Sequence, residues 1–237
     1  MSKDIIYGYN CVYETILNNK VDEIYINRSK KIKDIEKIAS EKKLKVNYVE
    51  KHELDKITNS KNHQGIAATG NFFNYISLEQ MIKKEEFIII LDEIQDVNNF
   101  GAILRSCDSF GVTNVIIPKN RSVSLNSSVA KISTGAYNYV NVCLVTNIKQ
   151  TIKLLKKNQY WIAALDMDGD TKISNIDFSS KLAIIIGGEN KGITSNIKKD
   201  VDYTITIPMV GHVNSLNVSN ATAILLYEFS NKNNERK

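Results

Sequence analysis

The feature that most constrains the fold is the alternation of apolar runs and helical patterns from residue 87 onward. Residues 87–94 read FIIILDEI, an unbroken apolar stretch typical of a strand buried on both faces. Five more strands are predicted at 112–118, 139–145, 160–166, 182–189 and 202–209, and helices at 99–111, 126–136, 147–158 and 215–231. Because strands that alternate with helices form a mostly parallel sheet covered on both sides, the sequence predicts an α/β domain.

The segment before residue 87 has a different character. A lysine-rich helix at 30–43 places Ile32, Ile35 and Ile38/Ala39 on one stripe. Around it, strands are predicted at 22–27 and 45–50, a loop that leads into a strand at 61–73, and a helical linker at 76–86. We therefore expect a domain at 1–75, a linker at 76–86 and a second domain at 87–237.

Composition excludes several classes of protein. No apolar stretch approaches the 18 or so residues of a membrane span, and the first residues lack an apolar signal region, so we expect a cytoplasmic or organelle-interior protein. The net charge of +5 is compatible with an RNA partner. Cys11, Cys107 and Cys143 are odd in number and show no metal spacing, which favours core packing.

Three segments follow apolar strands: residues 91–106, 185–194 and 207–221. Ligands of open α/β sheets usually bind at the carboxyl ends of the strands. The run GGENKG fits neither the dinucleotide fingerprint nor the Walker loop, and no nucleophile elbow surrounds Ser215. The three histidines form no metal-ligand pattern, so we expect no metal centre.

Polar side chains on these turns are the candidates for chemistry: Asn99, Arg105, Glu189, Ser215 and Asn217. Each also has a structural interpretation, since Asn99, Ser215 and Asn217 suit helix caps, Glu189 suits a turn, and Arg105 suits a solvated helix face. Only four of the 31 basic residues are arginine, namely Arg28, Arg105, Arg121 and Arg236, a mild indication that guanidinium geometry is wanted. The last helix carries Val218, Ala221, Leu225 and Phe229 at helical spacing, a stripe for core or dimer interface.

All three segments resemble the signature motifs of SpoU-type RNA 2'-O-methyltransferases, in the family's order. IPMVGHVNSLNVSNA (207–221) is the most specific, beside LDEIQDVNNFGAILRSCDSFGV and GGENKGI. Residues 5–16, 63–68 and 118–136 resemble the branch that modifies a guanosine in large-subunit ribosomal RNA. The chain departs from the family at Val97, where a proline is usual, and carries Asn190-Lys191 in the second motif's loop.

The resemblance implies a parallel sheet with a deep trefoil knot (the SPOUT fold), preceded by a small ribosomal-protein-like RNA-binding domain. It also implies S-adenosylmethionine as cosubstrate, a homodimer, and RNA rather than DNA as partner. By position in the motifs, the cofactor would be held by Gly187, Gly188, Ile207, Met209, Ser215 and Leu216.

The implied reaction is attack of a ribose 2'-hydroxyl on a sulfonium methyl group. Arg105 matches the family's essential arginine, but a guanidinium does not readily accept a proton. We therefore expect Arg105 to orient the hydroxyl and stabilise the developing oxyanion, with Asn99 and Glu189 positioning it and the proton acceptor open. The resemblance leaves open whether Arg105 and the cofactor come from the same subunit or from opposite subunits of the dimer. Two alternatives remain: methylation of a transfer RNA ribose, and a noncatalytic RNA-binding protein.

Overall fold

The computed structural model describes residues 3–84, 86–188, 192–212 and 215–234 of the 237-residue chain. The described chain forms two compact units. The first comprises Met1–Asn74 together with Leu125–Asn138, and the second comprises Tyr75–Ser124 together with Tyr139–Lys237.

A four-stranded sheet in the order β1-β4-β2-β3 is the base of the first unit. Its elements are β1 (Asp4–Tyr7), α1 (Tyr9–Leu17), β2 (Val21–Asn27), α2 (Lys33–Glu41), β3 (Lys45–Val49), α3 (Lys51–Thr58) and β4 (Ile66–Gly70). β4 pairs antiparallel with β1 and β2, whereas β2 pairs parallel with β3. Ile32, Ile35 and Ala39 are buried, which confirms the apolar stripe predicted for α2.

The segment between β6 and β7 of the chain also belongs to the first unit. It contains α6 (Ser127–Ile132) and a short 3-10 helix, η1 (Ala136–Asn138). Ser127 Oγ donates to the Ile5 carbonyl, and the Tyr137 and Thr15 hydroxyls are hydrogen-bonded at 2.9 Å in a buried position. The structure therefore differs from the division expected from the sequence, which assigned 125–138 to the second domain. Its side chains are buried against α1 and β1, a long-range relation that local periodicity does not encode.

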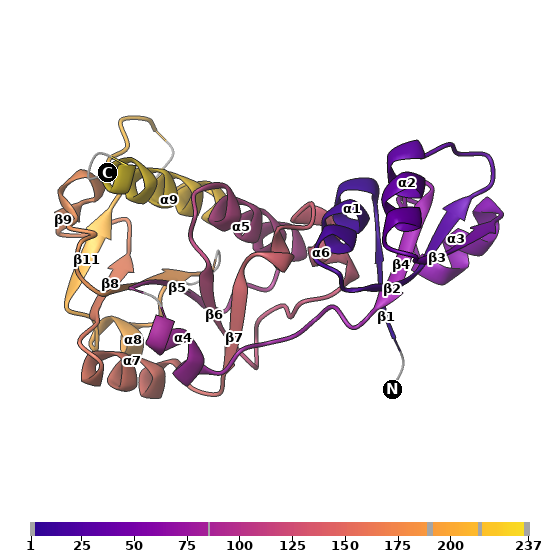
Figure 1. The fold of residues 1–237 in the computed structure, drawn as a ribbon. Coiled ribbons are helices and arrows are strands. Elements are labelled where there is room, and N and C mark those ends of the chain that lie inside the picture. Colours follow the sequence, from indigo (N-terminus) through magenta and orange to yellow (C-terminus); the bar gives the residue numbers. More distant parts are fainter. Residues whose placement is uncertain (1–2, 85, 189–191, 213–214, 235–237) are drawn as a thin grey trace. The chain divides into compact units, whose positions relative to one another are not determined.

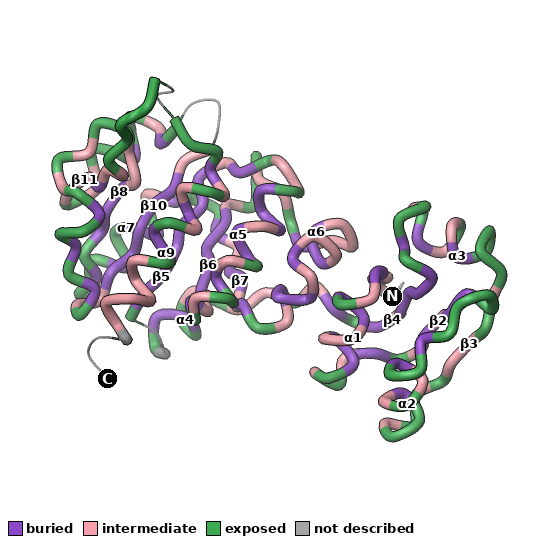
Figure 2. Tube along the Cα trace, turned by 90° about the horizontal axis from the view of Figure 1, so that it is seen from above, coloured by how far each residue is buried: buried purple, intermediate pink, exposed green. Residues whose placement is uncertain are grey.

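The second unit contains a seven-stranded sheet in the order β7-β6-β5-β10-β8-β11-β9, and the pairs between neighbours are parallel. Its strands are β5 (Phe87–Asp92), β6 (Asn114–Pro118), β7 (Asn141–Val145), β8 (Trp161–Leu165), β9 (Thr171–Lys172), β10 (Leu182–Gly187) and β11 (Tyr203–Thr206). Every residue of β5 is buried, as its unbroken apolar run predicts (Figure 2). The predicted α/β class with a mostly parallel sheet is confirmed.

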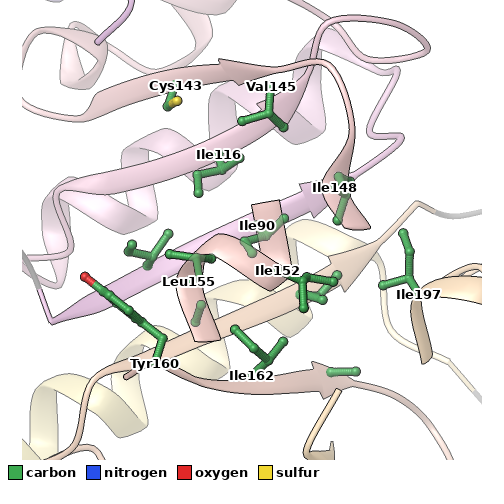
Figure 3. Close-up of a cluster of buried hydrophobic side chains, with 14 of the residues drawn as sticks. Ile90, Ile116, Cys143, Val145, Ile148, Ile152, Leu155, Tyr160, Ile162 and Ile197 are labelled. Carbon is green, nitrogen blue, oxygen red and sulfur yellow. The ribbon is translucent and has the colours of Figure 1, made fainter. Parts of the chain in front are cut away.

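Helices cover both faces of this sheet (Figure 1). One face carries α4 (Leu78–Lys84), α7 (Ile148–Lys157) and α8 (Ser195–Lys198), and the other carries α5 (Val97–Ser109) and α9 (Val218–Asn234). Ile152 and Leu155 of α7 pack on Ile90, Ile116 and other strand residues in one apolar cluster (Figure 3). The expected linker 76–86 contains α4, whose Met81 belongs to that cluster, so this segment is part of the second unit's core rather than a free connection.

The last helix packs inward by the stripe seen in the sequence. Leu225 is fully buried, Val218 nearly so, and the Phe229 ring stacks on Phe87 with centroids 4.2 Å apart. This stripe is therefore core within one chain rather than a dimer interface. Neither α9 nor any other helix in the described part of the chain is long and apolar enough to cross a membrane.

The centre of the sheet is occupied by β10, which lies between β5 and β8 although it comes much later in the chain. Leu182 to Gly187 pair in register with Phe87 to Asp92. The turn after β10 therefore emerges between the carboxyl ends of β5 and β8. This arrangement brings the second motif to the middle of the edge where ligands of parallel sheets bind.

Candidate functional site

A pocket of about 670 Å³ opens at the carboxyl edge of the large sheet, where β8, β10 and β11 end. Four stretches form its walls: the end of β8, the turn after β10, the segment after β11 and the start of α9. Its volume lies in the range of small-molecule sites. The second and third sequence motifs both contribute to it, as their position after predicted strands indicates.

The wall after β10 is built from backbone. A Cβ atom on Gly187 would lie 2.2 Å from the Gly192 carbonyl carbon, and one on Gly188 would lie 2.7 Å from the Glu93 carbonyl oxygen. Only glycine fits at either position, because both distances are far below van der Waals contact. The two glycines thus let main-chain segments converge at this wall of the pocket.

The wall from the third motif is largely apolar. Ile207, Met209 and Leu216 line it, and Met209 and Leu216 are about 40% and 39% exposed, which is unusual for large apolar side chains. Ser215 lies beside them and is exposed. Flat apolar surface next to backbone polar groups suits a heteroaromatic ring.

Asn217 begins the last helix. Its Oδ1 accepts hydrogen bonds from the Ser219 backbone N–H at 2.9 Å and from the Ser219 hydroxyl at 2.6 Å. This is the N-cap role considered for it in the sequence, and Asn217 also lines the pocket. Ser215 lies two residues earlier and makes no capping hydrogen bond to any residue that the structure describes. The cap fixes where the lining segment ends and α9 begins.

The wall from β8 was missed by sequence reasoning. Leu165, Asp166, Met167 and Asp168 line the pocket, and Asp166 pairs with Lys198 of α8. Burial alone would raise the pKa of Asp166, but the hydrogen bond and charge of Lys198 outweigh burial and lower it. The available signal was position, because this stretch also follows an apolar strand.

All six residues expected to hold the cofactor line this one pocket: Gly187, Gly188, Ile207, Met209, Ser215 and Leu216. Of the expected catalytic residues, only some line the pocket. Ser215 and Asn217 line it, Arg105 and Asn99 do not, and Glu189 lies outside the described residues.

Helix α5 carries Asn99 and Arg105. Asp96 caps this helix by accepting from the backbone N–H groups of Asn98 and Asn99, so Asn99 is not the cap that the sequence allowed it to be. Asn99 is buried in the first turn, while Arg105 is exposed about 1.7 turns further along the helix. Val97 occupies the first helical position, where proline is also favoured, so its presence leaves the helix start intact.

Asp92, at the end of β5, is a buried carboxyl group that the sequence analysis did not single out. It is 3% exposed, and its Oδ2 has no hydrogen-bond partner among the residues the structure describes. Burial raises its pKa, and the nearby Glu93 carboxylate adds to the rise, against a hydrogen bond from the Thr194 backbone and the charge of Arg121. Asp92, which belongs to the first motif, therefore contacts Thr194 of the second.

The remaining candidates have local roles. His63 is buried, with Nε2 2.9 Å from Asp55 Oδ1 and Nδ1 accepting from the Gly65 N–H, so it holds its loop. The three cysteines are free and buried, and burial raises the thiol pKa of Cys11 and Cys107 to about 12 and that of Cys143 to about 11, consistent with core packing. Within the described ranges, no group of His, Cys, Asp and Glu side chains has the arrangement of a metal site.

Comparison with protein families accounts for both parts of the chain. A model described as RNA 2'-O ribose methyltransferase substrate binding matches residues 5–76, and the model of the SpoU rRNA methylase family matches residues 86–227. This chain belongs to the SpoU rRNA methylase family. The residues that line the pocket all lie within the range that matches the methylase model.

Relatives of this SpoU-family chain match it from end to end. A protein of Staphylococcus haemolyticus named for the TrmH family of tRNA/rRNA methyltransferases is 40% identical, over 99% of this chain and 98% of the relative. Its counterpart in Staphylococcus aureus strain COL is 38% identical over the same shares. Each match therefore spans both the substrate-binding and the methylase parts of this chain.

Solved structures share the fold. The SpoU methyltransferase AviRb from Streptomyces viridochromogenes, in complex with AdoMet, superposes with a TM-score of 0.82 at 19% identity, covering 98% of this chain and 90% of AviRb. An AdoMet-bound rRNA methyltransferase from Sinorhizobium meliloti gives 0.80 at 20% identity, covering 97% and 87%. At these identities the likeness concerns the fold.

Proposed function

We propose that this SpoU-family protein transfers a methyl group from S-adenosylmethionine to a ribose 2'-hydroxyl of RNA. The pocket carries the proposal, because the six positions that the motifs assign to the cofactor come from two distant segments and line one cavity. The match of residues 5–76 to a substrate-binding model of RNA 2'-O ribose methyltransferases supports the acceptor.

The residues present fit S-adenosylmethionine. Ile207, Met209 and Leu216 offer apolar surface for adenine, and Gly187 and Gly188 allow a ligand to approach the main chain closely. Asp166 is paired with Lys198, which also lines the pocket, whereas Asp168 places negative charge in a site for a ligand that carries positively charged sulfonium and ammonium groups. The bound cofactor supplies an electrophilic methyl group on that sulfonium.

Arg105 is the proposed catalytic residue. A planar guanidinium can donate two hydrogen bonds at once, which suits holding a ribose hydroxyl and a neighbouring phosphate while negative charge develops on the 2'-oxygen. Its pKa is too high for it to act as the base. Asn99, Glu189 and Ser215 are proposed to position the ribose or Arg105, and the identity of the proton acceptor is left open.

A shared active site in a homodimer would bring Arg105 to the cofactor. Arg105 is exposed on α5 and does not line the pocket of its own chain. On the adjacent α9, Asn220, Ile224 and Tyr227 are exposed at helical spacing, and the Tyr227 ring contacts Phe110 at the end of α5. We propose that this face of α5 and α9 meets a second copy, so that each pocket receives Arg105 from the partner.

The substrate is proposed to be a guanosine ribose of large-subunit ribosomal RNA, on the likeness of residues 5–16, 63–68 and 118–136 to that branch. The names of the relatives include transfer RNA as well, so a transfer RNA ribose is the competing acceptor. The proposed trefoil knot is supported by the late strand β10 at the sheet's centre. A cytoplasmic location is proposed from the bacterial relatives.

Calorimetric titration tests the cofactor. S-adenosylmethionine and its demethylated product should bind, and NAD and ATP should not. At 100 times its dissociation constant, S-adenosylmethionine should raise the free energy of unfolding by about 2.7 kcal/mol. ATP binding without S-adenosylmethionine binding would refute the assignment, and mapping of 2'-O-methyl sites in RNA from cells lacking the protein identifies the acceptor. If the protein binds the cofactor but RNA from cells lacking it keeps every 2'-O-methyl group, the noncatalytic alternative is favoured.

A further inference from the structure

The loop after β6 holds an arginine in an unusual arrangement at the same edge of the sheet. Arg121 Nη1 lies 3.0 Å from Glu93 Oε1, and both residues have left-handed backbone, with φ of +59° each. Most other non-glycine residues with positive φ, such as Asn59 and Gln159, follow helices, where this conformation is a common helix ending, and Gln64 lies in the loop before β4. Glu93 and Arg121 instead follow strands, so no helix ending accounts for them.

Stability does not explain this arrangement. A left-handed backbone costs a residue other than glycine on the order of 1 kcal/mol or more, and two residues bear that cost here. The Arg121 side chain is 75% exposed, and an exposed ion pair returns only about 0–1 kcal/mol. The Ser122 hydroxyl that follows is buried and has no hydrogen-bond partner among the described residues, a further cost. A backbone hydrogen bond from the Val123 N–H to the Ile94 carbonyl joins the two segments, and local strain of this kind is typical of functional positions.

The pair lies next to the pocket. Glu93 directly follows Asp92, whose carbonyl accepts from the N–H of Gly188 at 2.9 Å. The Glu93 carbonyl oxygen itself faces Gly188 so closely that a Cβ there would lie 2.7 Å away. Since Gly188 lines the pocket, the backbone of Glu93 is in contact with the pocket wall.

The geometry leaves the guanidinium available to an anion. Arginine has five N–H donors in a rigid plane, and Glu93 contacts the Nη1 end. Glu93 thus restrains the side chain at one end and leaves donors directed to solvent. A planar fork of this kind matches the oxygens of a phosphodiester, and the chain uses arginine at only four positions.

We propose that Arg121, held by Glu93, binds a backbone phosphate of the RNA substrate at the rim of the pocket. The proposal rests on the proposed RNA methylation, and it adds a substrate-positioning residue outside the three signature motifs. Phosphate contacts fix the register of a bound nucleic acid without reading its sequence, so Arg121 sets where the RNA strand lies relative to the methyl donor.

Binding measurements on the full-length protein test this proposal without relying on turnover. The probes are unmodified transcripts of large-subunit ribosomal RNA and of a transfer RNA, titrated at several salt concentrations. Arg121→Gly removes the guanidinium at a position where glycine adopts the same φ without strain, so its folding should not suffer. It should raise the dissociation constant for RNA about tenfold and lower the slope of log affinity against log salt by about 1.

A charge-matched control separates position from charge. Lys157→Ala removes one positive charge from the exposed end of α7, at the amino edge of the sheet, and should leave the RNA dissociation constant within about twofold of the original. Glu93→Gln removes a negative charge, so simple electrostatics predicts tighter RNA binding. The proposal predicts weaker binding, because Arg121 loses its restraint.

The outcomes decide between the explanations. Equal effects of Arg121→Gly and Lys157→Ala, or tighter RNA binding by Glu93→Gln, would overturn the proposal. A collapse of S-adenosylmethionine affinity in Arg121→Gly would mean that Arg121 binds the cofactor carboxylate instead. If the unaltered protein binds RNA but not S-adenosylmethionine, the proposed methylation fails while the phosphate contact is still tested by these same titrations.

Discussion

At the scale of single residues, the site divides into positions that shape a cavity and positions that act on the acceptor. Gly187 and Gly188 belong to the first kind, since adjacent backbone leaves no space for a side chain. Arg105 belongs to the second, being exposed and outside the cavity of its own chain. Substitutions should therefore separate loss of cofactor binding from loss of turnover.

Substitution of Arg105 should abolish methyl transfer while sparing the cofactor. We expect both Arg105→Lys and Arg105→Ala to lower single-turnover RNA methylation by roughly 10² or more, because lysine cannot supply a planar two-pronged donor. Cofactor affinity, measured by titration on the same proteins, should change little. Near-normal methylation by Arg105→Lys would refute the specific role, and lost cofactor binding would make Arg105 structural.

Adding a methyl group at Gly187 should close the pocket wall. The Cβ of Gly187→Ala would meet the Gly192 carbonyl carbon at 2.2 Å, so the turn after β10 must shift and cofactor affinity should fall at least tenfold. Gly211→Ala is the matched control, because no described atom outside its chain neighbours lies within 4 Å of its Cβ and its φ is ordinary. Equal cofactor affinity in the two variants would show that the glycine turn does not shape the site.

At the scale of elements, the position of helix starts was harder to predict than the elements themselves. The sequence placed the start of α5 at Asn99, whereas Asp96 caps it and Val97 begins it. Asp96, Asn98 and Asn99 are all residue types that favour the N-cap position. Which one caps the helix depends on where the preceding strand ends in space. The same ambiguity at Ser215 and Asn217 was resolved in favour of Asn217.

The cap of α9 should matter to the ligand as well as to the helix. Asn217→Ala removes the acceptor for the Ser219 N–H and should lower the free energy of unfolding by about 1 kcal/mol. Asn147→Ala, which removes the corresponding cap of α7, should lower it similarly. Chemical denaturation and cofactor titration distinguish the two. We expect weaker S-adenosylmethionine binding in Asn217→Ala alone, and a loss shared by both would point to general destabilisation.

The exposed face of α9 is expected to mediate self-association. Ile224→Glu places a charge on a residue that is 39% exposed, so the monomer should fold normally while a dimer formed through this face should dissociate. Sedimentation velocity at micromolar concentration measures the change. Mixed dimers of Arg105→Ala and Gly187→Ala chains should regain methylation if the site is shared. A monomeric unaltered protein, or no recovery on mixing, would contradict the shared site.

At the scale of the whole molecule, the sequence predicted most of the second unit's strands and helices in order, because buried strands and amphipathic helices have local signatures. It missed the two-residue strand β9 and the four-residue helix α8, which are too short to have such a signature. The sheet order and the transfer of 125–138 to the first unit are relations between distant segments, and periodicity does not record them. Likewise, Asp166 and Asp92 gained significance only from their neighbours in space. Arg105 and the glycines were identified from the sequence because they match motifs of a family whose members share the same spatial arrangement.

The discontinuous first unit changes how the two units can be separated. A fragment that begins at residue 75 and retains 125–138 would leave Val129 and Tyr137 without the surroundings that bury them, and should aggregate. Replacing 125–138 by a Gly-Ser linker in that fragment should give a monodisperse protein that binds S-adenosylmethionine but methylates RNA poorly. Gel filtration, titration and turnover assays check each expectation. Full turnover by the linker version would show that the first unit is dispensable.

The central place of β10 also bears on how the protein is made. A ribosome releases β5, β6, β7 and β8 well before residues 182–187, so the nascent chain presents the facing edges of β5 and β8 with nothing between them. Unpaired strand edges invite association with other chains, and pairing across such long sequence separations is slow. The pocket therefore cannot form until β10 has been synthesised and has paired with both edges. A chain truncated before residue 182 would be a substrate for proteases rather than a weakened enzyme.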